Sequence, residues 1–467
     1  MESLTISEIL KATKGKLIQG NKNYLVSNIT IDTRKLMPGD LFIAIKGKLL
    51  DGHTYIDESL RKGADGVITE DSRFEFKNWE TTNIIQVVNT TKALGDIALY
   101  YRNKFSPKVI AITGSNGKTT TKEMTAQILK TKFNIVSAPA SFNNDIGVPL
   151  TVLQLTKDTE VLILEMEMNE LGGTKRLCDI AQPNIGVVTN IGDTHLEFLY
   201  SRQGVAQEKS ELLEFISGSG TAILNADDSM IMEMWQRFNF KVYFTFGIEK
   251  SADIFANKII NHLEQGTEFR LCNKYITRLR VPGVFNIYNA LAAASIAKAV
   301  GCEFENIVLA LEEYTSAPMR MERVEINGIT IFNDAFNANP QSMLAALETF
   351  AGFTASGRKI VVLGDMLELG VKSAEFHRDL GKNLPKSIDI LITVGGQAKH
   401  IAEGSKEAGK KPEEVIICND YLKASNKLVD ILKIGDKILI KGSRLMKLEE
   451  IINKLKEQHM DANERRL

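Results

Sequence analysis

Short apolar runs separated by polar, glycine-rich turns dominate the middle of the chain. Runs rich in β-branched side chains occupy residues 109–113, 161–166, 185–191 and 221–228. Runs of this length bounded by Gly, Asn or Asp are typical of parallel strands buried on both faces. The alanine-rich segment 288–300 predicts a helix. The pattern therefore predicts an α/β domain with a parallel sheet at its centre.

The flanking regions carry their own strand patterns. Before a break at Pro107, residues 40–45 and 66–69 have the composition of strands. After Pro318 the chain again alternates strand-like and helical segments, and its strands ("ITIFND", "KIVVLGD", "DILITVGG", "KILIKGS") end in Asp, Gly or Ser. Such endings are expected where a parallel sheet presents binding loops. We expect an α/β protein of three domains: a smaller N-terminal substrate domain, a central P-loop-type domain and a C-terminal Rossmann-like domain, at residues 1–106, 107–316 and 317–467.

Length and composition agree with this division and exclude several classes of protein. A chain of 467 residues is too long for a single hydrophobic core and suggests about three domains. A net charge of −1 gives no sign of nucleic-acid or anionic-membrane binding. Four scattered cysteines suggest buried thiols in a reducing compartment. With neither a signal-peptide pattern nor a long apolar run, we expect a soluble cytoplasmic protein, and a monomer by default.

The first candidate site is the segment "VIAITGSNGKTTTKEM" at residues 109–124. Gly114 and Gly117 would let the backbone approach an anion, and the helix start after them offers free N–H groups. Lys118 could reach the β- and γ-phosphates, and the Thr119 hydroxyl could bind Mg²⁺. The common pattern G-x-x-x-x-G-K-[ST] has a glycine where this chain has Ile112. An ordinary turn with a solvated Lys118 is the alternative, but a buried strand before it and a helix after it favour a phosphate loop.

A phosphate loop needs an acidic partner for its metal at a nearby strand end. Glu165 closes the strand at 161–166, although Glu167 and Glu170 follow and leave the choice open. His195 lies just beyond another strand end, after a Gly-Asp turn. Its position predicts a metal ligand rather than an isolated surface histidine.

Five blocks in this order resemble the Mur ligase family: "TGSNGKT", Asn143-Asn144, Glu165-Met166, "TNIGDTHLE" and "YNALAA". The family consists of ATP-dependent amide ligases of peptidoglycan synthesis, with relatives that extend folate with glutamate. Its phosphate loop lacks the first glycine of the common pattern, so Ile112 agrees with the resemblance.

Three further blocks, "DTRKLMPGDLFIAIKGKLLDGH", "NDAFNANP" and "LGDMLELG", are similar to one branch of this family. That branch joins D-alanyl-D-alanine to UDP-N-acetylmuramoyl-tripeptide. The resemblance implies that ATP converts a carboxylate into an acyl phosphate, which the dipeptide amine attacks with release of ADP and phosphate. It leaves open whether the third peptide residue is L-lysine or meso-diaminopimelate.

The resemblance also implies roles for individual residues. It gives ATP contacts to Gly114, Ser115, Asn116, Gly117, Lys118, Thr119, Thr120, Asn289, Arg320, Asp334 and Asn337. It implies a metal site for two Mg²⁺ ions, formed by Thr119, Glu165, His195 and a carbamylated Lys209. The catalytic set is Lys118, Glu165, His195 and Lys209. It gives the UDP-sugar to Asp32, Thr33, Arg34, Lys46, Gly47, Asp51, Gly52, His53, Asn143 and Asn144.

The chain departs from the family at three positions. Glu167 stands where relatives commonly have glycine, and Ala335 and Phe336 replace two hydroxyl-bearing residues. Glu167 could crowd the metal site or point into solvent, and the other two changes should alter local hydrogen bonding. Residues 363–370 and 441–450 are candidates for the dipeptide pocket. The rival functions are another amide ligase of the family and a nucleotide-binding regulator without turnover.

Overall fold

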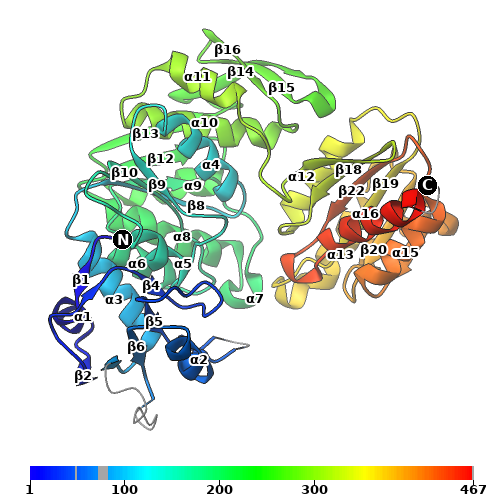
Figure 1. Ribbon diagram of the computed structural model, residues 1–467. Helices are drawn as coiled ribbons and strands as arrows, with labels where there is room; N and C mark the ends of the chain where they lie inside the picture. The colour runs from blue at the N-terminus through cyan, green and yellow to red at the C-terminus, as the bar shows by residue number, and fades with distance from the viewer. Residues whose placement is uncertain (48–49, 72–81, 465–467) are drawn as a thin grey trace.

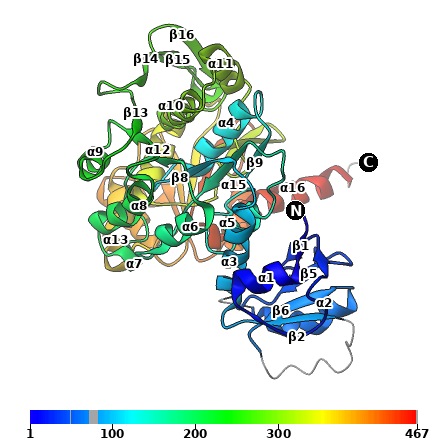
Figure 2. The same ribbon diagram turned by 90° about the vertical axis from the view of Figure 1, so that its left-hand side faces the viewer.

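The computed structural model describes residues 1–47, 50–71 and 82–464, and its three domains follow one another along the chain (Figure 1). The N-terminal domain is blue, the central domain runs from cyan to light green, and the C-terminal domain runs from yellow to red. In the second view the N-terminal domain lies below the central domain, with α3 (Thr90–Arg102) at their junction (Figure 2). Across the described ranges, no helix has the length and apolar character to cross a membrane.

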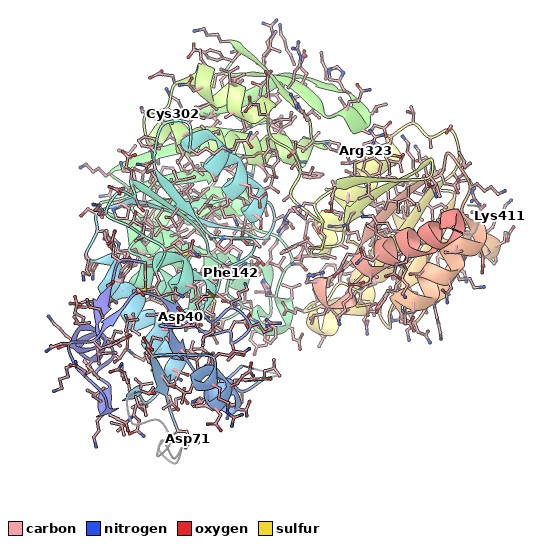
Figure 3. The ribbon with its side chains drawn as sticks, in the orientation of Figure 1. Asp40, Asp71, Phe142, Cys302, Arg323 and Lys411 are labelled. Atoms are coloured by element: carbon pink, nitrogen blue, oxygen red, sulfur yellow. The ribbon has the colours of Figure 1, made fainter. Side chains whose placement is uncertain are left out.

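The N-terminal domain is built on a sheet of five strands. Their order is β2 (Lys16–Gln19), β7 (Asn83–Gln86), β6 (Gly66–Thr69), β5 (Leu41–Ile43) and β4 (Ile29–Thr30), and only β2 is antiparallel to its neighbour. The strands β1 (Leu4–Thr5) and β3 (Leu25–Val26) form a separate pair, and the helices are α1 (Ile6–Thr13) and α2 (Ile56–Arg61). Asp40, labelled in Figure 3, is buried and accepts hydrogen bonds from Asn28 Nδ2 (2.8 Å) and Met37 N (2.9 Å). These bonds fix the turn that leads into β5.

The central domain has a nine-stranded sheet in which β8 (Lys108–Thr113) lies between β10 (Val161–Glu165) and β11 (Ile185–Val188). The parallel part continues with the edge strand β9 (Ile135–Ser137), with β12 (Thr221–Asn225) and with β13 (Val242–Gly247). A meander of β14 (Ile254–Asn261), β15 (Thr267–Leu271) and β16 (Tyr275–Leu279) extends the other edge. Parallel strands β8, β10 and β11 therefore present their carboxyl ends at one place.

Helices cover both faces of the central sheet. On one face, Ile110 and Ile112 of β8 pack in a cluster with α4 (Lys118–Leu129), α10 (Val284–Ala299) and α11 (Phe304–Glu312). On the other face, Val109 and Ala111 pack toward α5 (Gly147–Val152), α6 (Gly173–Ala181) and α8 (Arg202–Ile216). Two short helices, α7 (Leu196–Leu199) and α9 (Ser229–Met234), follow strand ends. Burial on both faces explains why the strand sequences are almost continuously apolar.

The C-terminal domain has a six-stranded sheet. The order is β17 (Glu322–Ile326), β18 (Ile329–Asp334), β22 (Lys437–Lys441), β19 (Lys359–Gly364), β20 (Ile390–Val394) and β21 (Val415–Cys418), with only β17 antiparallel. Helices α12 (Pro340–Ala351), α13 (Ser373–Lys382), α14 (Lys399–Glu407), α15 (Tyr421–Ile431) and α16 (Glu449–Glu464) surround it. The predicted α/β class is confirmed, including the parallel sheet with helices on both sides.

The strands that the sequence did not predict include β7 and β13, which lie inside their sheets, and the meander β14 to β16 at one end of the central sheet. β15 alternates buried and half-buried positions, and β14 is exposed over its second half. A strand with one face in water lacks the continuous apolar run by which the buried strands are recognised. The four cysteines are free; Cys178, Cys302 and Cys418 are buried as predicted, whereas Cys272 is half-buried.

Helix α3 connects the first two domains. It packs against α1 as well as against α5 and α6. Tyr101 is fully buried in this junction; its hydroxyl donates to Leu155 O (2.6 Å) and accepts from Glu2 N (2.6 Å). Arg102 donates to the carbonyl of Ala181 (3.2 Å), at the end of α6. The residues around the first domain boundary thus belong to both cores.

We expect Tyr101→Phe to lower the free energy of unfolding by about 1–3 kcal/mol, because the buried Leu155 carbonyl loses its donor. The matched control is Tyr100→Phe in the same helix, whose half-buried hydroxyl makes one long bond to Glu8 (3.3 Å). Urea denaturation followed by circular dichroism measures both. Equal losses in the two variants would contradict this account of the junction.

Candidate functional site

The loop between β8 and α4 can only be made with glycine at two positions. Gly114 has φ +141° and Gly117 has φ +81°. A Cβ at Gly114 would lie 2.0 Å from Thr189 Oγ1, and one at Gly117 would lie 2.1 Å from Asn289 Oδ1. Ile112 is fully buried inside β8, opposite Glu165 in the register with β10. A glycine would serve no purpose there, since the turn begins two residues later.

The segment after β11 holds this loop in place. Ser115 N donates to Asn190 O and Asn116 N to Asn190 Oδ1, both at 2.9 Å. Thr189 Oγ1 donates to Asn116 O at 2.6 Å. The Ser115 hydroxyl accepts from Gly192 N (2.8 Å). Two strand ends therefore build one rigid turn before the first residue of α4.

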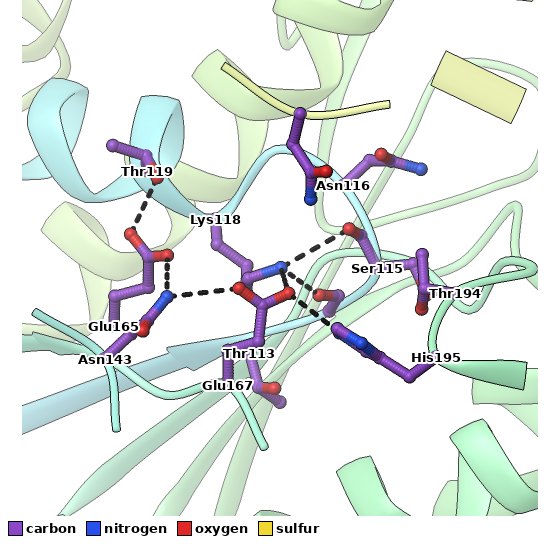
Figure 4. A network of polar contacts seen from close by, with 12 residues as sticks. Thr113, Ser115, Asn116, Lys118, Thr119, Asn143, Glu165, Glu167, Thr194 and His195 are labelled. Carbon is purple, nitrogen blue, oxygen red and sulfur yellow. Dashed lines mark hydrogen bonds and ion pairs between the residues drawn. The ribbon is translucent and has the colours of Figure 1, made fainter. Parts of the chain in front are cut away.

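Lys118 begins α4 and turns its ammonium group back into the loop. Its Nζ donates to Gly114 O (2.7 Å) and Ser115 O (3.3 Å). It also forms an ion pair with Glu167 Oε1 at 2.7 Å (Figure 4). Glu167 therefore points into the site, which decides between the two orientations that the sequence left open.

Glu165 stands beside this pair, at the carboxyl end of β10. Its Oε2 accepts from Thr119 Oγ1 (2.7 Å), and its Oε1 accepts from Asn143 Nδ2 (2.9 Å) (Figure 4). Asn143 Nδ2 also reaches Glu167 Oε2 (3.1 Å), so one amide bridges the two carboxylates. Asn143, which the resemblance gave to the UDP-sugar, lies beside these carboxylates; Asn144, given to the same substrate, accepts from Ile146 N and Gly147 N at the start of α5.

His195 connects this group to the C-terminal domain. It has a left-handed backbone (φ +55°), and its Nδ1 lies 2.5 Å from Glu368 Oε2 while its Nε2 lies 3.3 Å from Glu167 Oε1. Burial alone would lower the pKa of His195, but the hydrogen bonds with Glu167 and Glu368 outweigh it and raise the pKa to about 9. Burial opposes the charged form of Glu167, yet Lys118 and His195 hold its pKa well below the usual range. To bind a metal, His195 would first have to release one carboxylate.

Lys209 is fully buried in α8. Its Nζ lies 3.1 Å from Glu208 Oε2. Its charge contributes to lowering the pKa of both Glu167 and His195, which places it at the edge of the same group. Complete burial of a lysine beside a polar site fits a functional role better than a structural one.

The side chains around the loop suit magnesium in its usual mode. Glu165 and Glu167 offer carboxylate oxygens, and Thr119 offers a hydroxyl. Over the described part of the chain, no three His, Cys, Asp or Glu side chains form a metal cage. Mg²⁺ is commonly held by one or two carboxylates together with phosphates and water rather than by an all-protein cage. The donor set therefore fits Mg²⁺ that arrives with a polyphosphate.

Two adjoining cavities lie over the loop. The larger has a volume of about 350 Å³ and includes Asn116, Asn289, Phe285, Tyr288 and Arg320 in its lining. Aromatic and amide groups around a space of this size suit a nucleoside. The smaller, of about 70 Å³, is lined by residues 115–119, both carboxylates and residues of the C-terminal domain. Gly117 and Arg320 border both, so the two cavities join.

Arg320 reaches from the domain junction to the phosphate loop. Its Nη2 donates to Thr119 Oγ1 (2.7 Å), and its guanidinium lies 4.2 Å from the ring centre of Phe336. Phe336, one of the departures from the family, thus supports Arg320 through its ring face. Ala335, another of these departures, is buried in the C-terminal core. Asp334 accepts from Met321 N (3.1 Å) and pairs with Lys441 (2.7 Å), whose Nζ also donates to Asn337 O (3.0 Å).

The predicted UDP-sugar residues of the N-terminal domain gather where β4, β5 and β6 end. Arg34 is exposed and binds Asp32 with both Nε and Nη2, which lowers the pKa of Asp32 to about 2. Lys46 pairs with Asp51 as a β-bridge, and Asp51 accepts from His53 N (3.0 Å). The remaining members are Thr33, Gly47 and Gly52. Residues 48 and 49 of this block lie outside the described residues.

Several residues at the site escaped the sequence prediction. Glu368 belongs to a segment assigned only to the dipeptide pocket, and Asn339 forms a reciprocal pair with Asn116, with distances of 2.7 and 3.3 Å. Lys122 is buried 3.9 Å from Glu165, and burial lowers the pKa of Lys122 although Glu165 opposes this. The sequence signal that could have identified Lys122 is its position four residues after Lys118. Nothing in the sequence connects positions 116 and 339.

Comparison with known proteins agrees with this geometry. The Mur ligase middle domain matches residues 112–297, the glutamate ligase domain of the Mur ligases matches 319–444, and the Mur ligase catalytic domain matches 25–102. A UDP-N-acetylmuramoyl-tripeptide--D-alanyl-D-alanine ligase of Buchnera aphidicola subsp. Baizongia pistaciae is 36% identical, with 98% of this chain and 100% of that protein covered. The chain belongs to the Mur ligase family.

Other members of the family extend the comparison. The Bacillus subtilis ligase of the same name is 34% identical, with 97% of this chain and 98% of that protein covered. Among solved structures, MurF from Acinetobacter baumannii superposes with a TM-score of 0.87 at 29% identity, covering 98% of this chain and 99% of that one. MurF from Thermotoga maritima, solved in complex with ADP, has a TM-score of 0.81 at 28% identity and covers 94% and 99%. This Mur ligase therefore shares its whole architecture with MurF structures.

We expect His195 to be protonated at neutral pH in metal-free buffer, and Glu368→Gln to lower its pKa by removing a carboxylate partner. Since its pKa is raised above the ordinary value of about 6.5, His195 stabilises the fold fully below that pH and loses this effect as pH rises through 9. NMR titration of the imidazoles measures the pKa, with His195→Gln for assignment and Glu197→Gln, a nearby exposed carboxylate, as control. A His195 that titrates near 6.5 in the unsubstituted protein would contradict the contacts described.

Proposed function

We propose that the protein joins D-alanyl-D-alanine to UDP-N-acetylmuramoyl-tripeptide, using ATP and releasing ADP and phosphate. The observation that carries the proposal is the single polar site at which Lys118, Glu165 and Arg320 meet beside a nucleoside-sized cavity. Relatives of full length that bear the name of this activity support it. The proposal places the reaction in peptidoglycan precursor synthesis; the cytoplasmic location and the monomeric state stay predictions.

The domains would divide the substrates between them. We assign the UDP-sugar to residues 1–106, the ATP phosphates to residues 107–316, and closure over the nucleotide with binding of the dipeptide to residues 317–467. A cavity of about 400 Å³ supports this division, since it runs from Thr91 at the start of α3 to Asn143, Glu167 and His195. The carboxyl end of the tripeptide would approach the phosphate loop through this cavity.

The reaction needs an activated carboxyl group, because an ionised carboxylate does not react with an amine at neutral pH. Transfer of the γ-phosphoryl group of ATP to the tripeptide carboxylate would give an acyl phosphate. The dipeptide amine would then form the amide bond with loss of phosphate. Lys118 and Arg320 are placed to balance charge on the transferring group, which is the main requirement of phosphoryl transfer.

Glu165, Glu167 and Thr119 would hold Mg²⁺, with Lys209 as a further ligand if it is carbamylated; the family resemblance implies two ions. Magnesium would supply additional neutralisation of phosphate charge when bound. The domains themselves would keep water away from the acyl phosphate. Contacts across the boundary between the central and C-terminal domains, such as Asn116 with Asn339 and His195 with Glu368, support this role.

We expect phosphate release to require all three substrates, since the acyl phosphate must be both formed and consumed. The assay combines the protein with ATP, D-alanyl-D-alanine and the UDP-tripeptide that carries either L-lysine or meso-diaminopimelate, which also identifies the third residue. Lys118→Ala should lower kcat by about 10²–10³-fold, as does the loss of one preorganised donor in other enzymes. Phosphate release that does not depend on the dipeptide, or none at all, would exclude the proposed ligase.

We expect Phe336→Leu to raise the KM for ATP by about three- to thirtyfold, the range of a cation–π contact. The reason is that Arg320 would lose the ring that holds its guanidinium near Thr119. Phe336→Tyr keeps the ring face and serves as the matched control. Steady-state kinetics at saturating UDP-tripeptide and dipeptide separate the two variants. Equal KM values for Leu and Tyr would show that the ring does not act through Arg320.

A further inference from the structure

Glu167 forms an ion pair with the ammonium group of Lys118, which the phosphate loop would need for binding phosphate. An ammonium group has three N–H donors. Those of Lys118 are directed to Gly114 O, Ser115 O and Glu167 Oε1 at 2.7, 3.3 and 2.7 Å. The side chain of Lys118 is only 7% exposed, so water has little access to it. An arriving phosphate oxygen therefore has to compete with Glu167 for Lys118.

The backbone and neighbours of Glu167 keep its carboxylate in this position. Glu167 N donates to Asn143 O (2.9 Å), and Asn143 Nδ2 donates back to Glu167 Oε2 (3.1 Å). His195 Nε2 lies on the other side, 3.3 Å from Oε1. Figure 4 shows the carboxylate between Lys118, Asn143 and His195. Glu167 thus has hydrogen-bonding partners on three sides, which hold its carboxylate beside the phosphate loop.

The effect of this carboxylate on a polyphosphate depends on what accompanies the polyphosphate. A bare nucleotide would bring several negative charges next to Glu167 and Glu165, and the repulsion would be strong in a partly buried site. A nucleotide that carries Mg²⁺ would meet two carboxylates and the Thr119 hydroxyl as oxygen ligands. The same side chain would then favour binding.

We propose that Glu167 makes nucleotide binding conditional on a divalent cation. In the free protein its carboxylate balances the charge of Lys118 through their ion pair. The site then binds the metal complex of the nucleotide in preference to the bare polyphosphate. The inference rests on the proposed function only in that the loop binds a nucleotide. The role follows from the contacts that hold the Glu167 carboxylate against Lys118. Without a carboxylate at this position, Lys118 would be free to bind the nucleotide with or without a cation.

The experiment is a titration with the non-hydrolysable ATP analogue AMP-PNP by isothermal calorimetry, in excess EDTA and in excess Mg²⁺. The quantity compared between variants is the dissociation constant in EDTA divided by the dissociation constant in Mg²⁺. We expect Glu167→Gln to lower this ratio at least about tenfold, chiefly by tightening binding in EDTA, because removing one charge at this distance relieves the repulsion. Glu167→Asp keeps the charge and should retain most of the ratio. Thermal melting confirms that each variant is folded.

The matched control is Glu170→Gln, which removes the same charge from the same segment. Glu170 is exposed and pairs with Arg176 (2.8 Å), so its loss should leave the ratio unchanged. A ratio for Glu167→Gln within about threefold of the unsubstituted protein, or a fall as large in Glu170→Gln, would overturn the proposal. If the unsubstituted protein binds AMP-PNP in neither condition, the nucleotide site of the proposed function is itself excluded.

Discussion

The positive charge of Lys118 is the constraint around which the site is arranged. The loop before it presents backbone N–H groups and leads into the start of α4, and both features attract anions. A buried ammonium in such a place needs negative partners, and the chain provides two carbonyls and Glu167. Asn143 then connects Glu167 to Glu165, and His195 connects it to Glu368. Each of these contacts holds a different segment of the chain at the loop.

Polar contacts of the residues around Lys118 also join the central and C-terminal domains. Arg320 and Asn339 reach the loop from the C-terminal side, and Glu368 reaches His195. Their partners Asn116, Thr119 and His195 belong to the site, so a ligand that displaces one of these contacts would also change how the domains hold each other. A ligand bound at the loop would therefore be coupled to the arrangement of the two domains through these polar contacts.

Much of the candidate site was predictable because it lies on consecutive residues at strand ends. Gly114, Gly117, Lys118 and Thr119 form a local motif, and Glu165 closes the neighbouring strand, so the parallel sheet alone brings them together. Glu167 was considered as a metal carboxylate and as a departure from the family, but the direction of its side chain could not be inferred from its spacing. The contacts of Asn143 with both carboxylates and the complete burial of Lys209 were not predicted. In each of these cases the outcome depends on a partner that is distant in sequence.

The sequence by itself determined the α/β class, the buried strands and the glycine-dependent loop, because these follow from local apolar runs and backbone sterics. The tertiary structure decided the edge strands, the use of α3 by two cores, and the meeting of Asn116 with Asn339 and of His195 with Glu368. Polar contacts of this kind have no periodicity and no fixed separation along the chain. Their geometry exists only once the sheets have placed their carboxyl ends face to face.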